Sequence, residues 1–141
     1  ADINMKVTRM TCEARIGNLE EVINFVDGCA DRIGLTGIKK NKALIAVEEA
    51  FVNVCHYAYP GATGEVELTC RGKNDAFEFE IADNGIPFNM LSLPDPDTTA
   101  DIMERKIGGL GVYLIRKLID DVSYRRKDGQ NILRMVLHTR K

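Results

Sequence analysis

The period of the hydrophobic residues changes along this chain in a definite order, and that order constrains the fold more than any other feature. Residues 2–10 alternate weakly and predict a strand, whereas the apolar residues of 19–33 and then of about 38–59 repeat at helical spacing. Two alternating segments follow on either side of a turn at 72–75 and predict a hairpin. The least regular part of the chain, residues 84–107, comes next.

The C-terminal part combines one helix with a second hairpin. The helix begins at the glycine-rich segment 108–111, and the turn Asp128-Gly129 joins strands near 122–127 and 131–139. Because consecutive strands are joined by turns, we expect a mixed, mostly antiparallel sheet with helices on one face, which is an α+β two-layer arrangement. The length of 141 residues predicts a single domain over 1–141.

Composition argues against several classes of partner. A formal net charge of -2 favours neither nucleic acid nor an anionic membrane as a ligand. No apolar run approaches the roughly 20 residues that span a bilayer, and the N-terminus lacks a signal-peptide pattern. The four cysteines form no CxxC pair, so we expect reduced thiols in a cytoplasmic protein rather than a zinc site or disulfides.

Glu49 and Asn53 lie one turn apart in the predicted helix 38–59, so their side chains point the same way. Magnesium takes oxygen ligands such as an amide carbonyl, and a carboxylate can accept a proton from a hydroxyl nucleophile. A Glu and an Asn at this spacing more often form a solvated pair. Asn is a poor helix former, however, and here it interrupts an apolar segment. We therefore treat the pair as a candidate base and metal ligand.

Asp83 ends a predicted strand and is followed by Asn84-Gly85. A carboxylate at this position can accept a hydrogen bond from an exocyclic amine such as that of adenine. Gly85 would let the backbone approach the ring closely. A plain Asn-Gly turn without a ligand is the alternative interpretation.

The segment Gly108-Gly109-Leu110-Gly111 presents free backbone N–H groups at the start of a helix, where phosphate groups bind without needing side chains. Three glycines in four residues are costly for a simple helix start. Arg105 and Lys106 precede the segment and would neutralise a polyphosphate, or else are solvated charges. His56, one turn beyond Asn53, would contact phosphate or make a structural hydrogen bond near the helix end.

Together these segments resemble the nucleotide-binding motifs of the GHKL ATPase superfamily, which has the Bergerat fold. Glu49-x-x-x-Asn53 resembles its N box, Asp83-x-Gly85 its G1 box and Gly109-x-Gly111 its G2 box. Within the superfamily the chain is most similar to the anti-sigma-factor serine kinases of the partner-switching type. That similarity lies in residues 49–59, 83–88 and 109–122.

Two departures from the pattern stand out. Ile86-Pro87 follows the Asp-x-Gly element where the wider superfamily often has a second glycine, as fits this branch. Ile107 separates Lys106 from the glycines, where family members often have a basic residue directly before them.

The resemblance implies roles for individual residues. Asn53 would ligate Mg²⁺, Glu49 would be the general base for a serine hydroxyl of a partner, and Asp83 would bind adenine. Gly109 and Gly111 would contact the phosphates of ATP, beneath a lid over about 86–107. The resemblance also implies two protein partners, an anti-anti-sigma protein that is phosphorylated and a sigma factor that is sequestered, and commonly a homodimer.

We therefore predict an ATP-dependent serine protein kinase of the anti-sigma type. One alternative is an ATP-binding regulatory module that sequesters a partner without transferring phosphate, but the intact Glu49 favours an enzyme. A second alternative is a histidine-kinase-like catalytic domain cut from a longer chain. Against it, no helical dimerisation segment with a phosphoacceptor histidine precedes the predicted domain.

Overall fold

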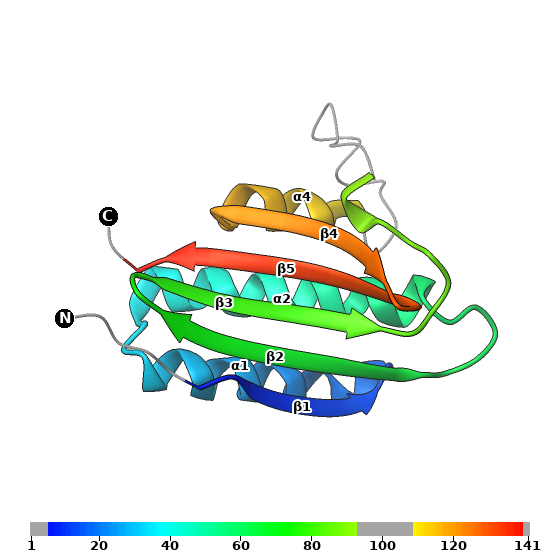
Figure 1. Cartoon of the computed structure of the whole chain (residues 1–141), viewed down its shortest axis with the longest axis horizontal. Coiled ribbons are helices and arrows are strands. Elements are labelled where there is room, and N and C mark those ends of the chain that lie inside the picture. Colours follow the sequence, from blue (N-terminus) through cyan, green and yellow to red (C-terminus); the bar gives the residue numbers. More distant parts are fainter. Residues whose placement is uncertain (1–5, 93–108, 140–141) are drawn as a thin grey trace.

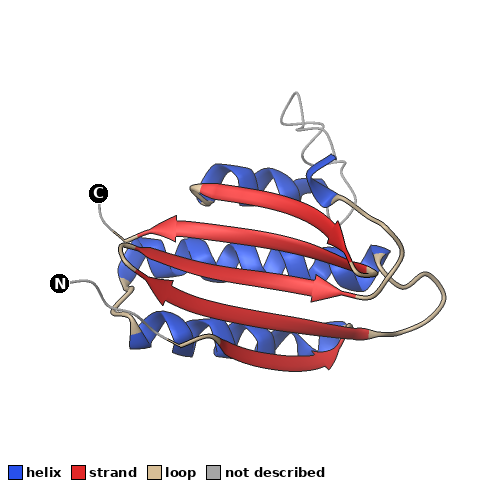
Figure 2. Ribbon diagram, in the orientation of Figure 1, coloured by secondary structure: helices blue, strands red, loops and turns tan. Residues whose placement is uncertain are grey.

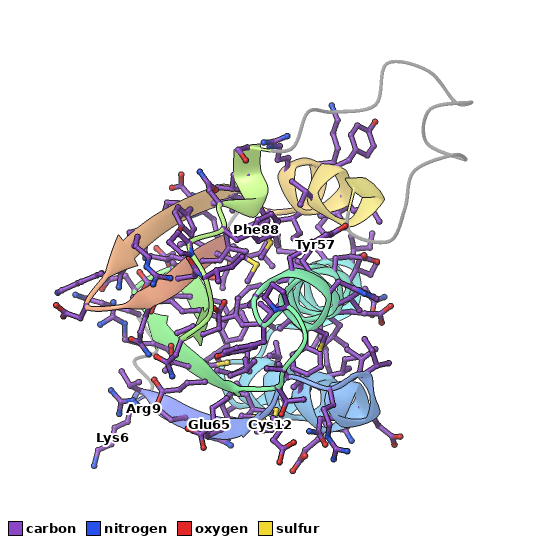
Figure 3. The ribbon with its side chains drawn as sticks, turned by 90° about the vertical axis from the view of Figure 1, so that its right-hand side faces the viewer. Lys6, Arg9, Cys12, Tyr57, Glu65 and Phe88 are labelled. Carbon is purple, nitrogen blue, oxygen red and sulfur yellow. The ribbon has the colours of Figure 1, made fainter. Side chains whose placement is uncertain are left out.

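Five strands form one sheet, and helices cover one of its faces in the computed structural model (Figures 1 and 2), which describes residues 6–92 and 109–139. The elements are β1 (Thr8–Glu13), α1 (Leu19–Arg32), α2 (Gly37–Tyr57), β2 (Glu65–Lys73), β3 (Ala76–Asp83), α4 (Gly109–Leu118), β4 (Asp121–Lys127) and β5 (Gln130–His138). Short 3₁₀ helices occupy Ile16–Asn18 and Met90–Ser92. Seen along the layers, the sheet lies on one side and the helices on the other (Figure 3).

The strands lie in the order β1-β2-β3-β5-β4, and each of these four neighbouring pairs is antiparallel. The α+β sandwich with helices on one face is thus confirmed, but the sheet is antiparallel throughout the described strands rather than mixed. The reason is that β3 and β4, which are joined through α4 and run in the same direction, do not pair. β5 lies between them and pairs with both.

Alternation along the central strands builds the core. The inward residues of β2 and β3 are buried, and the residues between them face the open side of the sheet. The inward residues of both strands pack against the apolar face of α2. The side chains at this junction that are almost fully buried are Val66, Leu68, Phe77, Phe79, Ile81, Val47, Phe51 and Val54. Burial of this face holds α2 at a fixed distance behind the sheet.

Two element boundaries differ from the sequence-based expectation. β1 covers Thr8–Glu13 rather than 2–10, because its pairing with β2 extends to Glu13; residues 1–5 lie outside the described residues. The first hairpin turns at Asn74 and Asp75 alone, since Gly72 pairs with Phe77 inside the ladder. Asn74 has a φ of 55°, a left-handed conformation that asparagine tolerates.

α2 occupies the middle of the helical layer, with α1 on one side and α4 on the other (Figure 1). Every sequence motif of interest therefore lies on α2 or on an element next to it. No helix in the described parts of the chain is long and apolar enough to span a membrane. The four cysteines are free thiols, and Cys29 and Cys70 are buried.

Candidate functional site

Glu49, in the middle of α2, lies against the first turn of α4. A Cβ atom added at Gly111 would lie 2.5 Å from Glu49 Oε2 and 3.0 Å from Glu49 Cβ, so the Glu49 carboxylate fills the space that a side chain at 111 would need. Burial raises the pKa of Glu49, and the neighbouring carboxylate of Glu48 raises it further. A carboxylate with a raised pKa is a stronger base near neutral pH, which suits proton acceptance.

Asn53, one turn further along α2, is fully buried. Its Nδ2 lies 3.7 Å from the sulfur of Met90, which is a weak acceptor. Its Oδ1 has no hydrogen-bond partner among the described residues. An unpaired buried amide oxygen costs about 1–3 kcal/mol. A bound cation or a hydrogen-bond donor of a ligand would pair with this oxygen, so Asn53 Oδ1 is suited to bind such a group.

Asp83, the last residue of β3, is also buried and is held by two donors. Its Oδ1 accepts a hydrogen bond from the Gly85 backbone N–H at 2.8 Å and another from Asn131 Nδ2 at 2.9 Å. Burial raises the pKa of Asp83, while these two hydrogen bonds and the charge of Arg126 oppose that rise. Asp83 therefore combines a desolvated position with donors that favour its ionised form.

Gly85 brings the segment after β3 against the C-terminal end of α2. A Cβ atom at this position would lie 2.1 Å from the carbonyl oxygen of Ala58, so only glycine fits without moving backbone. The Ile86 N–H donates to that same carbonyl at 2.9 Å. Arg126 of β4 donates to the Gly85 carbonyl at 2.8 Å. The loop that follows Asp83 is thereby fixed to both layers.

The motifs thus meet α2 at successive positions along its axis. Glu49 contacts α4, Asn53 contacts Met90, and Ala58 contacts the loop after Asp83. Ala58, the residue that follows α2, lies nine positions after Glu49, which corresponds to a rise of roughly 14 Å. The ring of Phe88 in this loop lies 5.0 Å from the ring of Tyr57 (Figure 3). One helix therefore spaces the carboxylate of Glu49 from the loop at Asp83.

The remaining predicted residues have different positions. His56 is exposed on α2, with its ring 6.3 Å from that of Tyr57, and its contact with phosphate stays a prediction. Gly109 and Leu110 are the first residues of α4, as the sequence indicated. Lys106 and Gly108 lie outside the described residues, as does the part of the expected lid beyond residue 92.

Sequence reasoning missed Arg126 and Asn131, which hold the loop after Asp83 from the β4–β5 hairpin, more than 40 residues along the chain. It also missed Tyr124 of the same hairpin, whose hydroxyl donates to Asn131. Asn131 is buried and is the second residue of β5, a strand of mostly apolar residues. A polar residue at an inward strand position is the signal that would have pointed to it.

The described residues contain no group of three or more His, Cys, Asp and Glu side chains able to hold a metal ion. A cation at Asn53 would therefore need most of its ligands from elsewhere, such as phosphate oxygens and water. This is the usual situation of Mg²⁺ bound together with a nucleotide.

Comparison with known proteins agrees with this geometry. The model of the histidine kinase-like ATPase domain matches residues 12–137. The chain is 31% identical over 110 residues to the serine-protein kinase RsbW of Bacillus mycoides, covering 75% of this chain and 69% of that protein. Its identity to the protein of the same name from Bacillus cereus (strain Q1) is 32%, with the same coverage.

Solved structures show the same fold. A Mycobacterium tuberculosis structure of RsbU and RsbW domains superposes with a TM-score of 0.67 at 13% identity, covering 95% of this chain and 32% of that chain. The histidine kinase AdeS of Acinetobacter baumannii gives a TM-score of 0.51 at 12% identity, covering 97% of this chain and 70% of that chain. The chain therefore belongs to the histidine kinase-like ATPase family and, within it, to the family of the RsbW serine-protein kinases.

Proposed function

We propose that this protein is an ATP-dependent serine protein kinase of the anti-sigma type, with ATP lying along α2 between Asp83 and Glu49. The observation that carries the proposal is the order of contacts on that one helix: a half-buried carboxylate against the start of α4, an unpaired buried amide oxygen, and a fixed loop at Asp83. The match to the histidine kinase-like ATPase domain covers residues 12–137 and so contains all three motifs, and relatives named serine-protein kinase align with this chain over 110 residues.

Asp83 is the end of the site that binds the adenine ring. Its carboxylate accepts a hydrogen bond from the exocyclic amine of adenine. Gly85 lets the loop after Asp83 lie directly against the Ala58 carbonyl, which fixes the position of that loop. Burial raises the pKa of Asp83, and the two donors to its Oδ1 limit that rise by favouring the ionised form, which is the acceptor. Ionised Asp83 rejects a base that presents an acceptor at the same position, because two acceptors would then face each other.

The phosphate end is the start of α4. Backbone N–H groups at Gly109, Leu110 and Gly111 point out of the first helical turn and bind phosphate oxygens. Asn53 Oδ1 is the protein ligand for Mg²⁺, which neutralises phosphate charge when bound. Lys106, Gly108 and His56 are further candidates for phosphate contact, and residues of about 86–107 are the candidate lid.

Glu49 acts on the incoming nucleophile. The serine oxygen of the partner forms a bond to the γ-phosphorus, the bond from that phosphorus to the bridging oxygen breaks, and ADP leaves with the bond electrons. The serine proton passes to the Glu49 carboxylate. Burial raises the pKa of Glu49 and so strengthens it as a base. Positioning of the two reactants supplies most of the rate enhancement in phosphoryl transfer.

The partners follow from the proposed class of kinase. The substrate is an anti-anti-sigma protein carrying the acceptor serine, and a sigma factor is the sequestered partner. A homodimer, a cytoplasmic location and one domain spanning 1–141 complete the proposal. The alternative, a module that binds ATP without transferring phosphate, is not favoured, because Glu49 is intact and lies beside the phosphate end.

A thermal melt with and without Mg-ATP tests the nucleotide site. Ligand at 100 times its dissociation constant adds about 2.7 kcal/mol, which raises the melting temperature by several degrees in a domain of this size. The increase should disappear in Asp83→Ala. It should persist in Asp121→Ala, which removes an exposed carboxylate from β4. An equal increase in Asp83→Ala would contradict the assignment of Asp83 as the adenine-binding residue.

Phosphate transfer tests the enzyme. Wild-type protein, incubated with Mg-ATP and an anti-anti-sigma protein from the same organism, should produce a phosphoserine detected by mass spectrometry. Glu49→Gln should slow transfer by about a hundredfold or more while keeping the thermal shift with ATP. Transfer at the wild-type rate in Glu49→Gln would exclude the general-base role. ATP binding without transfer to any such protein would favour the binding module.

A further inference from the structure

The side chain of Asn131, at the start of β5, makes four hydrogen bonds. Its Nδ2 donates to Asp83 Oδ1 at 2.9 Å and to the Ile86 carbonyl at 2.7 Å. Its Oδ1 accepts from the Tyr124 hydroxyl at 2.6 Å and from the Phe88 N–H at 3.1 Å. An asparagine amide has two donor hydrogens and two acceptor lone pairs, so this set uses its full capacity.

The partners also define which end of the amide is which. The Phe88 N–H can only donate, so the atom facing it must be the oxygen, and the Ile86 carbonyl can only accept, so the atom facing it must be the nitrogen. Asn131 is 5% exposed, which keeps water from competing for these bonds. Its amide therefore has one orientation, and that orientation presents a donor to Asp83.

The consequence at Asp83 is an asymmetric carboxylate. Oδ1 accepts from both Gly85 N–H and Asn131 Nδ2. No donor in the described part of the chain bonds to Oδ2, which leaves that oxygen as the acceptor for a ligand. Arg126 strengthens the arrangement from β4 by donating to the Gly85 carbonyl. The β4–β5 hairpin thus prepares the loop before any nucleotide binds.

We propose that Asn131 is the positioning residue of the base site, which orients Asp83 so that its Oδ2 reads the exocyclic amine of a purine nucleotide. This inference rests on the proposed nucleotide site at Asp83. Asn131 does not touch the nucleotide, because all four of its hydrogen-bonding positions are occupied within the protein. It acts through Asp83 and through the loop of residues 84–88.

The test compares ATP with purine riboside triphosphate, which lacks the amine, in wild type and in Asn131→Asp. The variant has nearly the same shape but loses both N–H donors. We expect ATP to bind about tenfold more weakly or worse, because a hydrogen bond to a charged group is lost. Binding of the analogue should change little, so the preference for ATP should fall by the same factor. Gln130→Glu is the control, since it adds the same charge one residue away.

Equal preference for ATP in wild type and in a folded Asn131→Asp would overturn this inference alone. Absence of ATP binding in the wild type would overturn the proposed function and this inference with it. A second measurement needs no variant: both side-chain amide protons of Asn131 should exchange slowly with solvent in the nucleotide-free wild type, as seen by NMR. Rapid exchange of those protons would overturn the proposed positioning role, whether or not the variant folds.

Discussion

Replacement of Gly111 by alanine separates two roles that one glycine can have at the start of α4. A glycine there can expose a backbone N–H to phosphate, or it can leave space for the Glu49 carboxylate. Alanine keeps the N–H but adds a Cβ atom that would lie 2.5 Å from Glu49 Oε2. Real Cβ atoms do not approach so closely, so the carboxylate must move away by roughly 1 Å to reach ordinary contact.

The size of the effect follows from that displacement. A misplacement of about 1 Å costs about a hundredfold in rate when a group must meet its reactant in a defined geometry. The flexible end of Glu49 can move, and its Cβ, 3.0 Å from the added atom, needs a shift of only a few tenths of an ångström, so the fold should survive. Alanine is also a better helix former than glycine by up to about 1 kcal/mol. We expect Gly111→Ala to melt near the wild-type temperature, to bind Mg-ATP, and to transfer phosphate about a hundredfold more slowly.

A double-mutant cycle with Glu49→Gln makes the reasoning refutable. Transfer to the anti-anti-sigma substrate is measured by mass spectrometry for wild type, both single variants and the double variant. If Gly111 acts by making space for the catalytic carboxylate, Gly111→Ala should cost little once that carboxylate is gone. An equal loss in both backgrounds would refute the spatial role, because the loss would then not depend on the Glu49 carboxylate. Unchanged transfer in Gly111→Ala would also refute the spatial role, and it would leave the phosphate contact as the remaining role, since alanine keeps the backbone N–H.

Three further predictions follow from the same structure. Gly85→Ala should destabilise the fold by about 1–3 kcal/mol in denaturant titrations, because its Cβ would meet the Ala58 carbonyl oxygen at 2.1 Å, whereas Gly28→Ala, with open space around it, should not. The transfer rate should fall on acidification with a midpoint above the ordinary 4.5 of a glutamate, because burial raises the pKa of Glu49, and Glu49→Gln should abolish that midpoint. Burial alone would raise the pKa of Glu78, but its two arginine partners more than reverse this and lower it. Glu78 should therefore stabilise the fold by about 1 kcal/mol relative to Glu78→Gln. This contribution to the free energy of unfolding should be complete above pH 4.5, the ordinary pKa of a glutamate, and should disappear as the pH falls through the lowered pKa of Glu78.

Local patterns were enough for most of the fold. Helical spacing predicted α1 and α2, and alternation around Asp128-Gly129 predicted β4 and β5, because each of these elements is stabilised by contacts that repeat within one short segment. The limits of β1 depended on its pairing with β2, a partner more than 50 residues away. Alternation alone does not report where such a partner strand ends.

The motifs of the site were local as well. Glu49 and Asn53 share a helix, Asp83 and Gly85 share a turn, and Gly111 lies in the first turn of a helix, so their spacing and chemistry could be recognised in the sequence. The sequence by itself thus determined which groups are available for nucleotide chemistry and in what order they occur.

Only the tertiary structure decided how those groups are oriented. The burial of Asn53 Oδ1 without a partner and the fit of Glu49 into the space at Gly111 depend on how α4 and the segment at Met90 pack on α2. The hydrogen bond from Asn131 to Asp83 joins residues that are 48 positions apart in the sequence. Hydrogen bonds and close contacts are decided within fractions of an ångström, and only the packed core sets distances between distant segments that finely.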